Sequence, residues 1–333
     1  MQLAGSVRIV KLVKLCAAVL ALISANSFAQ GTASPYPSKP VAVVAPFPPG
    51  GAADSEARRY TNKMSAIIGQ QFVVDYKPGA ADTIGVGHVA RSAPDGYTLL
   101  VTAATFVVSG SLKKDLPYDI FKDFAPVSLM SRRPILLMAH PAFAATNMQD
   151  YFAYAKANPG GINYGTTGSG SISHLVGSWL HIAANAKVTY IHYKGAAPAT
   201  VDLVAGRIHV YAVPQLAAMP LIKSGKLRAL ASLDDRRSEL LPALATVAEQ
   251  GVPGFGYSNW IGFLAPGATP AGILNTLGEG FARVAKAPDV AGPLAAEGTM
   301  MVGSTPAQFR QIIAAEAARW RKLVQDTGIQ LED

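Results

Sequence analysis

The sequence is poor in cysteine and in charge, and each shortage excludes a class of protein. Cys16 is the only cysteine among 333 residues, and it lies inside an apolar N-terminal stretch. Once that stretch is removed, the chain can form neither a disulfide framework nor a thiol nucleophile. Charged residues make up 15% and hydrophobic residues 50%, which excludes a disordered chain. The length is enough for two compact domains.

Sequence motifs for metal, nucleotide and nucleic-acid sites are also missing. His174 and His181 stand seven residues apart, no HExxH motif occurs, and we expect no metal. The glycine-rich segments are followed by neither Lys-Ser nor Lys-Thr, so we expect no nucleotide cofactor. The formal net charge of +8 is spread without a basic run or a basic–aromatic stripe, so nucleic acid is not an expected partner. A mild basic excess does suit the attraction of small anions.

The N-terminus has the pattern of a secretory signal peptide. Basic residues at positions 8, 11 and 14 precede an apolar run over residues 15–23, and Ser27 and Ala29 supply small residues before a cleavage point. The run is shorter than the roughly 20 residues that span a bilayer, which disfavours a membrane anchor. We expect residues 1–29 to be a signal peptide cleaved near Ala29, and the protein to be exported.

Short apolar runs alternate with helical segments along the rest of the chain. Val41–Ala45 is a β-branched run typical of a buried parallel strand, and a helix over 53–68 ends at Gly69. This alternation predicts α/β architecture with parallel sheets. Further strands are expected at 72–74, 97–102, 134–140, 162–164, 188–191, 209–213, 227–232 and from 261, and further helices at 83–90, 148–157, 172–184, 199–205, 271–287 and 306–327.

Two apolar runs, 134–141 and 260–266, look alike, and each precedes small residues and a helix. Two equivalent strands crossing between lobes would form a double-strand hinge around an interlobe cleft. We therefore predict lobe 1 from residues 30–137 and 262–333, with lobe 2, residues 138–261, inserted into it.

Two glycine-rich loops, Phe47–Ala52 and Thr166–Ser171, follow predicted strands and lead into helices. Ligands of open α/β sheets bind beyond the carboxyl ends of strands, and helix N-termini attract anions. A plain turn and a hydroxyl-rich N-cap are the alternative explanations. The anion-binding interpretation selects these candidate ligand residues: Phe47, Gly50, Gly51, Ala52, Thr166, Thr167, Gly168, Ser169 and Ser171.

Catalysis is less well supported than binding. Ser169 and Ser171 stand near His174, which leaves a periplasmic hydrolase as the alternative function. However, Gly-Ser-Gly-Ser is not a nucleophile elbow, and no acid is visibly paired with His174. We expect no catalytic residues.

The chain resembles the Bug, or TctC-type, extracytoplasmic solute receptors of tripartite tricarboxylate transporters. The order of the matching segments over nearly the whole chain makes the resemblance specific. It is carried by residues 36–40, 46–51, 77–80, 94–99, 163–171, 193–195, 225–231, 265–266 and 269–270, together with Asp54, His174, Asp202 and Trp260.

The resemblance implies a two-lobed, type II periplasmic-binding-protein-like fold in a periplasmic, non-catalytic protein. It implies that backbone amides, hydroxyls and bridging waters of the two glycine-rich loops bind a small carboxylate-bearing solute. It also implies a membrane permease as partner, although many relatives have no linked permease and a sensor is the alternative. We expect a monomer.

Some residues depart from the family pattern or border the expected cleft. Asp82 stands where relatives usually have glycine, and either caps a helix or faces the ligand. The segment containing Thr102 and Thr105 lacks the polar character common in relatives. Tyr193 follows a strand. Asp202 is interpreted as a helix cap or a surface acid, and the alternative is that it accepts a hydrogen bond from a ligand's amine or hydroxyl. Asp82 and the segment 102–106 are predicted to select the solute, whose identity the sequence does not determine.

Overall fold

The computed structural model describes residues 36–80, 82–113 and 115–328. The chain divides into two units, Met1–Ser38 and Lys39–Asp333, and the fold described below belongs to the second. The expected signal peptide lies outside the described residues. Within the described ranges, no helix has both the length and the apolar character needed to cross a membrane.

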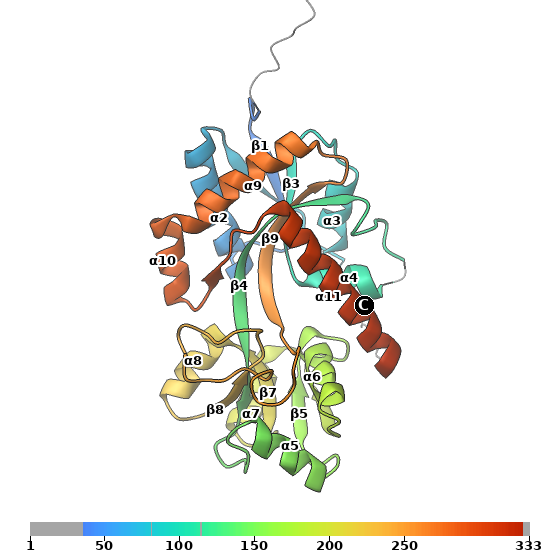
Figure 1. Ribbon diagram of the computed structural model, residues 1–333, viewed down its shortest axis with the longest axis vertical. Helices are drawn as coiled ribbons and strands as arrows, with labels where there is room; N and C mark the ends of the chain where they lie inside the picture. The colour runs from blue at the N-terminus through green and yellow to red at the C-terminus, as the bar shows by residue number, and fades with distance from the viewer. Residues whose placement is uncertain (1–35, 81, 114, 329–333) are drawn as a thin grey trace, which may run out of the picture. The chain divides into compact units, whose positions relative to one another are not determined.

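The first sheet has the strand order β2-β1-β3-β9-β4 and defines lobe 1 (Figure 1). β1 lies parallel to both β2 and β3, while β9 is antiparallel to β3 and β4. A short strand, β10, pairs with β4. The strands are β1 (Val41–Ala45), β2 (Phe72–Tyr76), β3 (Thr98–Ala103), β9 (Ser258–Pro266), β4 (Phe124–Ala139) and β10 (Met300–Met301).

Helices cover both faces of this sheet because its strands are apolar on both sides. On one face, Phe263 of β9 stacks on Phe281 at 4.1 Å between ring centroids and meets Tyr60 edge-on at 6.3 Å. On the other face, Leu100 packs in a core with Val86 and Phe309. The covering helices are α2 (Ala52–Ile68), α9 (Ala271–Lys286) and α10 (Pro288–Ala296), and α3 (Thr83–Ala90), α4 (Thr105–Leu112) and α11 (Pro306–Thr327).

The second sheet continues from β4 in the order β4-β7-β5-β6, with β8 also paired to β4, and defines lobe 2. Successive β4 side chains point to opposite faces. Leu137 therefore joins the core under α5 and α6, whereas Leu136 joins the core under α7 and α8. The elements are β5 (Asn163–Thr166), β6 (Thr189–His192), β7 (Val210–Pro214), β8 (Arg228–Ser232), α5 (Met148–Ala157), α6 (Ile172–Ala183), α7 (Ala196–Val204) and α8 (Gln215–Lys223).

Strand β4 belongs to both sheets, and its partners change between two neighbouring residues. Pro134 pairs with Ser258 of β9 in the first sheet, and Ile135 pairs with Pro214 of β7 in the second. β4 has the same direction as β3, because both are antiparallel to β9, and the opposite direction to β7. The carboxyl ends of β1, β2 and β3 therefore point toward the second sheet, and those of β5, β6 and β7 point back toward the first (Figure 1).

The α/β, two-lobed fold predicted from the sequence is confirmed, and most elements lie within a few residues of their expected positions. β4 begins at Phe124 and not at Pro134, because bulges and polar residues such as Ser128 and Ser131 hide the apolar pattern of its first part. Three helices were not expected: α4, α8 and α10. α8 and α10 contain an internal proline, and α4 is only 8 residues long.

Helix α11 connects the two lobes beside the β4–β9 crossing. The indole nitrogen of Trp260 in β9 donates to both carboxylate oxygens of Glu316, at 3.1 and 3.0 Å. One turn further along, the Arg319 guanidinium lies 4.3 Å from the ring of Trp179 in α6, and Trp320 meets the same ring edge-on. Burial raises the pKa of Glu316 to about 7.

The raised pKa predicts a stability that falls with increasing pH. Native Glu316 keeps its proton up to about pH 7, whereas the unfolded residue loses it near pH 4.5, so this contribution disappears as the pH rises between those values. At about 1.36 kcal/mol per pKa unit, Glu316→Gln should be more stable than wild type by about 3 kcal/mol at pH 8 and nearly equal at pH 4.5. Urea unfolding at both pH values measures the difference.

Glu279→Gln, a change at an exposed glutamate of α9, is the control and should leave the pH dependence unchanged. Asp234, whose pKa burial also raises to about 7, gives wild type a slope of the same sign. The measured quantity is therefore the difference in the free energy of unfolding between Glu316→Gln and wild type at each pH. If the stability of Glu316→Gln and that of wild type changed equally with pH, the raised pKa assigned to Glu316 would be contradicted.

Candidate functional site

The helices α2, α3 and α4 all begin at the carboxyl edge of the first sheet. Their N-cap residues, Gly51, Asp82 and Ala104, make no side-chain hydrogen bond to the first helical turn. The three helix starts are close together. Thr105 Oγ1 donates to Asp82 at 3.3 Å, and a Cβ on Gly85 would lie 2.9 Å from Pro46 Cα. Grouped, uncapped helix N-termini favour a negative charge.

Asp54 holds the glycine-rich loop between β1 and α2. Its Oδ2 accepts the Gly50 N–H at 2.8 Å, and its Oδ1 accepts the Tyr76 hydroxyl at 2.6 Å. Burial would raise the pKa of Asp54, but the hydrogen bonds from Gly50 and Tyr76 and the Arg58 charge lower it overall. Gly50 has φ +94°, a conformation that glycine tolerates best. Phe47 is half-buried, while Gly50, Gly51 and Ala52 are exposed.

Asp82 and Thr105 meet at this edge, but Asp82 does not cap α3. It occupies the N-cap position with φ +72°, and its carboxylate accepts from Thr105 in place of a helix N–H. The capping interpretation is therefore wrong, because this backbone conformation turns the side chain toward α4. Burial raises the pKa of Asp82. Thr102 lies on the same face of β3 as Leu100, is 1% exposed, and its hydroxyl has no partner among the described residues.

The second glycine-rich loop lies at the carboxyl edge of the second sheet, between β5 and α6. Ser171 caps α6 by accepting the His174 N–H, and its hydroxyl donates to Gly168 O at 2.7 Å. Thr166 Oγ1 lies 2.7 Å from His192 Nδ1, and Thr167 Oγ1 lies 3.1 Å from Ser173 Oγ. These hydrogen bonds join the loop hydroxyls to the loop backbone, to β6 and to α6, and they fix the conformation of the loop. Ser169, between two positive-φ glycines, is half-buried.

Tyr193 and Asp202 lie beside this loop and contact each other. The Tyr193 N–H donates to Thr166 O at 3.0 Å, and its hydroxyl donates to Asp202 Oδ2 at 2.8 Å. Asp202 also accepts from Arg207 at 2.8 Å. It lies in the last turn of α7, which begins at Ala196, so the interpretation of Asp202 as a helix cap is wrong. The hydrogen bonds from Tyr193 and Arg207 lower the pKa of Asp202.

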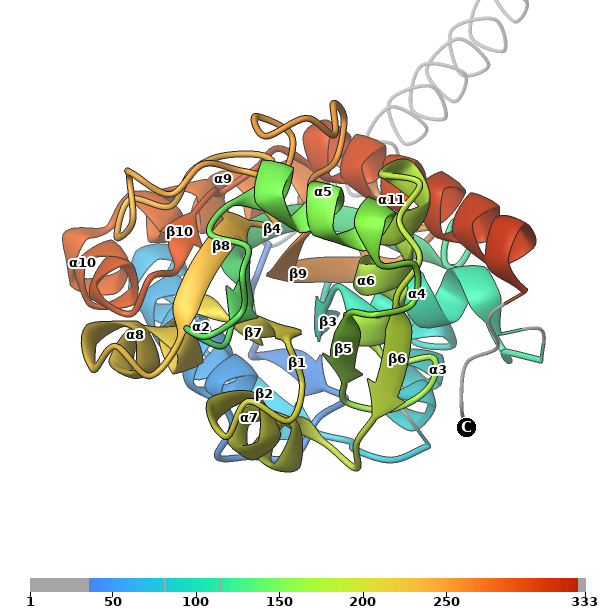
Figure 2. The same cartoon turned by 90° about the horizontal axis from the view of Figure 1, so that it is seen from below.

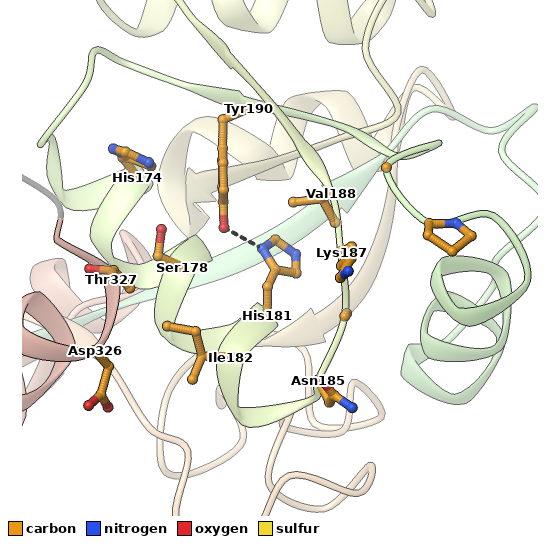
Figure 3. Close-up of a pocket in the computed structure, with 13 residues that line it drawn as sticks. His174, Ser178, His181, Ile182, Asn185, Lys187, Val188, Tyr190, Asp326 and Thr327 are labelled. Atoms are coloured by element: carbon orange, nitrogen blue, oxygen red, sulfur yellow. Dashed lines mark hydrogen bonds between the residues drawn. The ribbon is translucent and has the colours of Figure 1, made fainter.

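The histidines of α6 are neutral and hydrogen-bonded in the interior. His174 Nδ1 accepts the Gly170 N–H at 3.0 Å, and burial lowers the pKa of His174 to about 4. His181 lies between the hydroxyls of Tyr151 and Tyr190, and burial lowers its pKa to about 3. Both histidines border a cavity of about 820 Å³ (Figure 3). Within the described ranges, no cluster of three His, Cys, Asp or Glu residues could hold a metal ion.

Two residues at the crossing were missed by sequence reasoning. Arg133 of β4 forms an ion pair with the buried Glu56 of α2 and donates to Ala52 O at 3.0 Å. Gln215 begins α8 at the carboxyl end of β7, and lines a cavity of about 340 Å³ with Ala52 and Arg133. The same strand-to-helix rule that selected the glycine-rich loops would have selected Gln215, but Pro220 masked the helix.

The chain is similar to known proteins over most of its length. Residues 56–329 match a family described as the tripartite tricarboxylate transporter family receptor. Protein BugT of Bordetella pertussis is 35% identical over 313 residues, which is 93% of this chain and 96% of BugT.

Three solved structures are similar over most of the chain. A periplasmic transporter is 34% identical with a TM-score of 0.70, covering 89% of this chain and 100% of that one. Rpa4515 of R. palustris, with adipate, is 31% identical with a TM-score of 0.70 and the same coverages. MatC of Rhodopseudomonas palustris, with bound malate, is 30% identical with a TM-score of 0.67, covering 87% of this chain and 100% of MatC.

Removing the Asp54 carboxylate should loosen the Gly50 loop. Asp54→Ala leaves the Gly50 N–H and the Tyr76 hydroxyl without their acceptor and should lower the free energy of unfolding by about 1–3 kcal/mol. Hydrogen exchange in the peptide covering residues 47–54 should accelerate. Tyr76→Phe is the matched control, because it removes one bond to Asp54 and keeps the bond from Gly50. Equal exchange in Asp54→Ala and Tyr76→Phe would contradict the role given to Asp54.

Proposed function

Because the chain belongs to the tripartite tricarboxylate transporter receptor family, we propose that it captures a small carboxylate-bearing solute between its two glycine-rich loops. In this proposal the protein then delivers the solute to a tripartite membrane permease. The matched family is a family of receptors and not of enzymes, which removes the hydrolase alternative based on Ser169 and His174. The family and its periplasmic neighbour make this a periplasmic protein.

The strand directions carry the proposal. β4 runs with β3 and against β7, so the helix starts of one lobe and those of the other lie on edges that point toward each other. One cavity is lined both by Ala52 at the first edge and by Gln215 at the second, which supports the placement of the two edges opposite each other. A solute bound there would contact both lobes. The candidate contacts are Phe47, Gly50, Gly51, Ala52, Asp82, Thr102 and Thr105 in lobe 1, and Thr166, Thr167, Gly168, Ser169, Ser171, Tyr193 and Asp202 in lobe 2.

Backbone amides supply the positive end of the interaction. The first-turn N–H groups of α2 are uncapped, and the helix carries about half a positive charge at its N-terminus. The cation beside this loop, Arg58, is paired with Asp54 at 3.0 Å, and Arg133 is paired with Glu56. A carboxylate would therefore be held by dipoles, by hydroxyls and by bridging water, and not by Arg58 or Arg133, whose guanidinium groups already have acidic partners.

The ligands of two relatives support the class of solute. Adipate and malate, present with Rpa4515 and MatC, are both small carboxylates, and each of these proteins is at least 30% identical to this chain. We extend that class, and not either compound, to the present protein. A small carboxylate would fit between the two loops without a metal or a cofactor.

Binding would close the lobes about the two crossing strands. We place the lobe boundaries at residues 137/138 in β4 and 261/262 in β9, near the point where the β4 partners change from Ser258 to Pro214. A solute that touches both edges favours the closed form, because only that form makes both sets of contacts. We further propose that residues 1–29 are cleaved near Ala29 during export.

Bulk at Gly51 should block carboxylate binding without unfolding the protein. A Cβ at Gly51 meets no atom within 4 Å and the backbone φ is −81°, so Gly51→Leu is tolerated structurally but covers the uncapped start of α2. Calorimetry with a panel of small carboxylates should show affinity lowered at least about 30-fold, or about 2 kcal/mol. Gly272→Leu, at an exposed helical glycine with equal space, is the control.

Unchanged affinity in Gly51→Leu would refute the helix N-terminus as the anion site. A Gly51→Leu protein with a lowered melting temperature in the absence of ligand would point to a structural role for the glycine. We expect the melting temperatures of both glycine variants to match wild type without ligand, and Gly51→Leu alone to lose stabilisation by added carboxylate.

A further inference from the structure

The cavity between the two carboxyl edges adjoins the first glycine-rich loop. It has a volume of about 340 Å³, within the range of small-molecule pockets. Ala52, the first residue of α2, lines it together with residues of the crossing strands and of α8. Most of the wall is apolar and comes from Pro134, Ile135, Pro214, Leu216 and Ala217. A solute whose carboxylate lies at the start of α2 could place its other end here.

Gln215, one of the residues that line the cavity, has a buried side-chain amide without a hydrogen-bond partner among the described residues. The residue is 2% exposed, and neither Nε2 nor Oε1 has a hydrogen-bond partner among the described residues. Gly298, which also lines the cavity, makes room for the amide, because a Cβ there would lie 2.7 Å from Nε2. Leaving a buried polar group unpaired costs free energy. A ligand that satisfies both amide atoms would recover that cost.

The charges around the cavity do not favour a second anion. Arg133 is the cation among the described lining residues, and Glu56 and the Ala52 carbonyl already engage its guanidinium. The acid in the lining, Glu297, lies 3.7 Å from Arg59, which is not part of the wall. A carboxylate entering this end would therefore meet a neutralised arginine, an acid and the unpaired Gln215 oxygen.

We propose that Gln215 recognises a neutral carboxamide at the far end of the solute, so that the protein prefers half-amides of dicarboxylic acids to the diacids themselves. A carboxamide presents an acceptor and a donor side by side, as the Gln215 amide does, and two such groups pair through two hydrogen bonds. A carboxylate offers acceptors alone and leaves Oε1 unpaired. The apolar wall accommodates the aliphatic spacer. This inference rests on the proposed binding of a carboxylate at the start of α2.

Calorimetry with matched acids tests the inference. The panel is succinamate, glutaramate and adipamate, each against its diacid, with butyrate and hexanoate as acids that lack a second polar end. Wild type should bind the best half-amide about tenfold more tightly than the diacid of equal length. Gln215→Met should lower the half-amide affinity about tenfold, or about 1.4 kcal/mol, and change the monocarboxylate affinities by less than about threefold.

Gln311→Met, at an exposed glutamine of α11, is the matched control and should change no affinity. Gln215→Met should fold with equal or higher stability, because it replaces an unpaired buried amide with an apolar side chain of similar length. A diacid that binds wild type as tightly as its half-amide would overturn the inference, as would a half-amide preference that survives in Gln215→Met.

The two proposals fail differently. Acids that bind wild type and lose affinity in Gly51→Leu, with an unchanged profile in Gln215→Met, would leave the carboxylate site standing and overturn the role of Gln215. A panel in which no acid binds wild type would overturn both.

Discussion

Strand β4 pairs in both sheets, and its direction decides where every candidate binding group lies. β4 is codirectional with β3 and antiparallel to β7, so the parallel strands of the two lobes end on facing edges. Helix starts follow strand ends, and the uncapped N-termini of α2, α3 and α4 and the loop before α6 are therefore directed toward one region. β9 pairs with β4 up to the point where β4 passes into the second sheet, and α11 contacts both lobes beside these strands.

The electrostatics of this region come from dipoles more than from free charges. Asp54 is paired with Arg58 and Glu56 with Arg133, while burial keeps His174 neutral near pH 7. The N-termini of the helices add positive potential at this edge. Asp82, whose pKa burial raises, and the unpaired amide of Gln215 are the groups that differ from a plain anion site. In the proposals made above, these two residues are the ones expected to set the selectivity for the solute.

The sequence predicted the alternation of strands and helices, the two crossing strands and both glycine-rich loops, because each depends on local pattern. It could not reveal partners that are distant along the chain. The Asp82 carboxylate accepts a hydrogen bond from Thr105, which lies 23 positions along the sequence. The Tyr193 hydroxyl donates to Asp202, which lies within α7 because that helix begins earlier than the sequence predicted. Arg133 was missed for the same reason, since its importance comes from its ion pair with Glu56. Gln215 was missed for a local reason, because Pro220 masked the helix that it begins.

A crystal structure of the protein with a bound carboxylate tests the central claim most directly. The account predicts that the carboxylate oxygens lie within hydrogen-bonding distance, directly or through one water, of first-turn N–H groups of α2 in one lobe and of the Thr166–Ser171 loop in the other. It also predicts that Arg58 and Arg133 keep their present partners. A carboxylate held by either arginine, or bound to one lobe alone, would contradict the account.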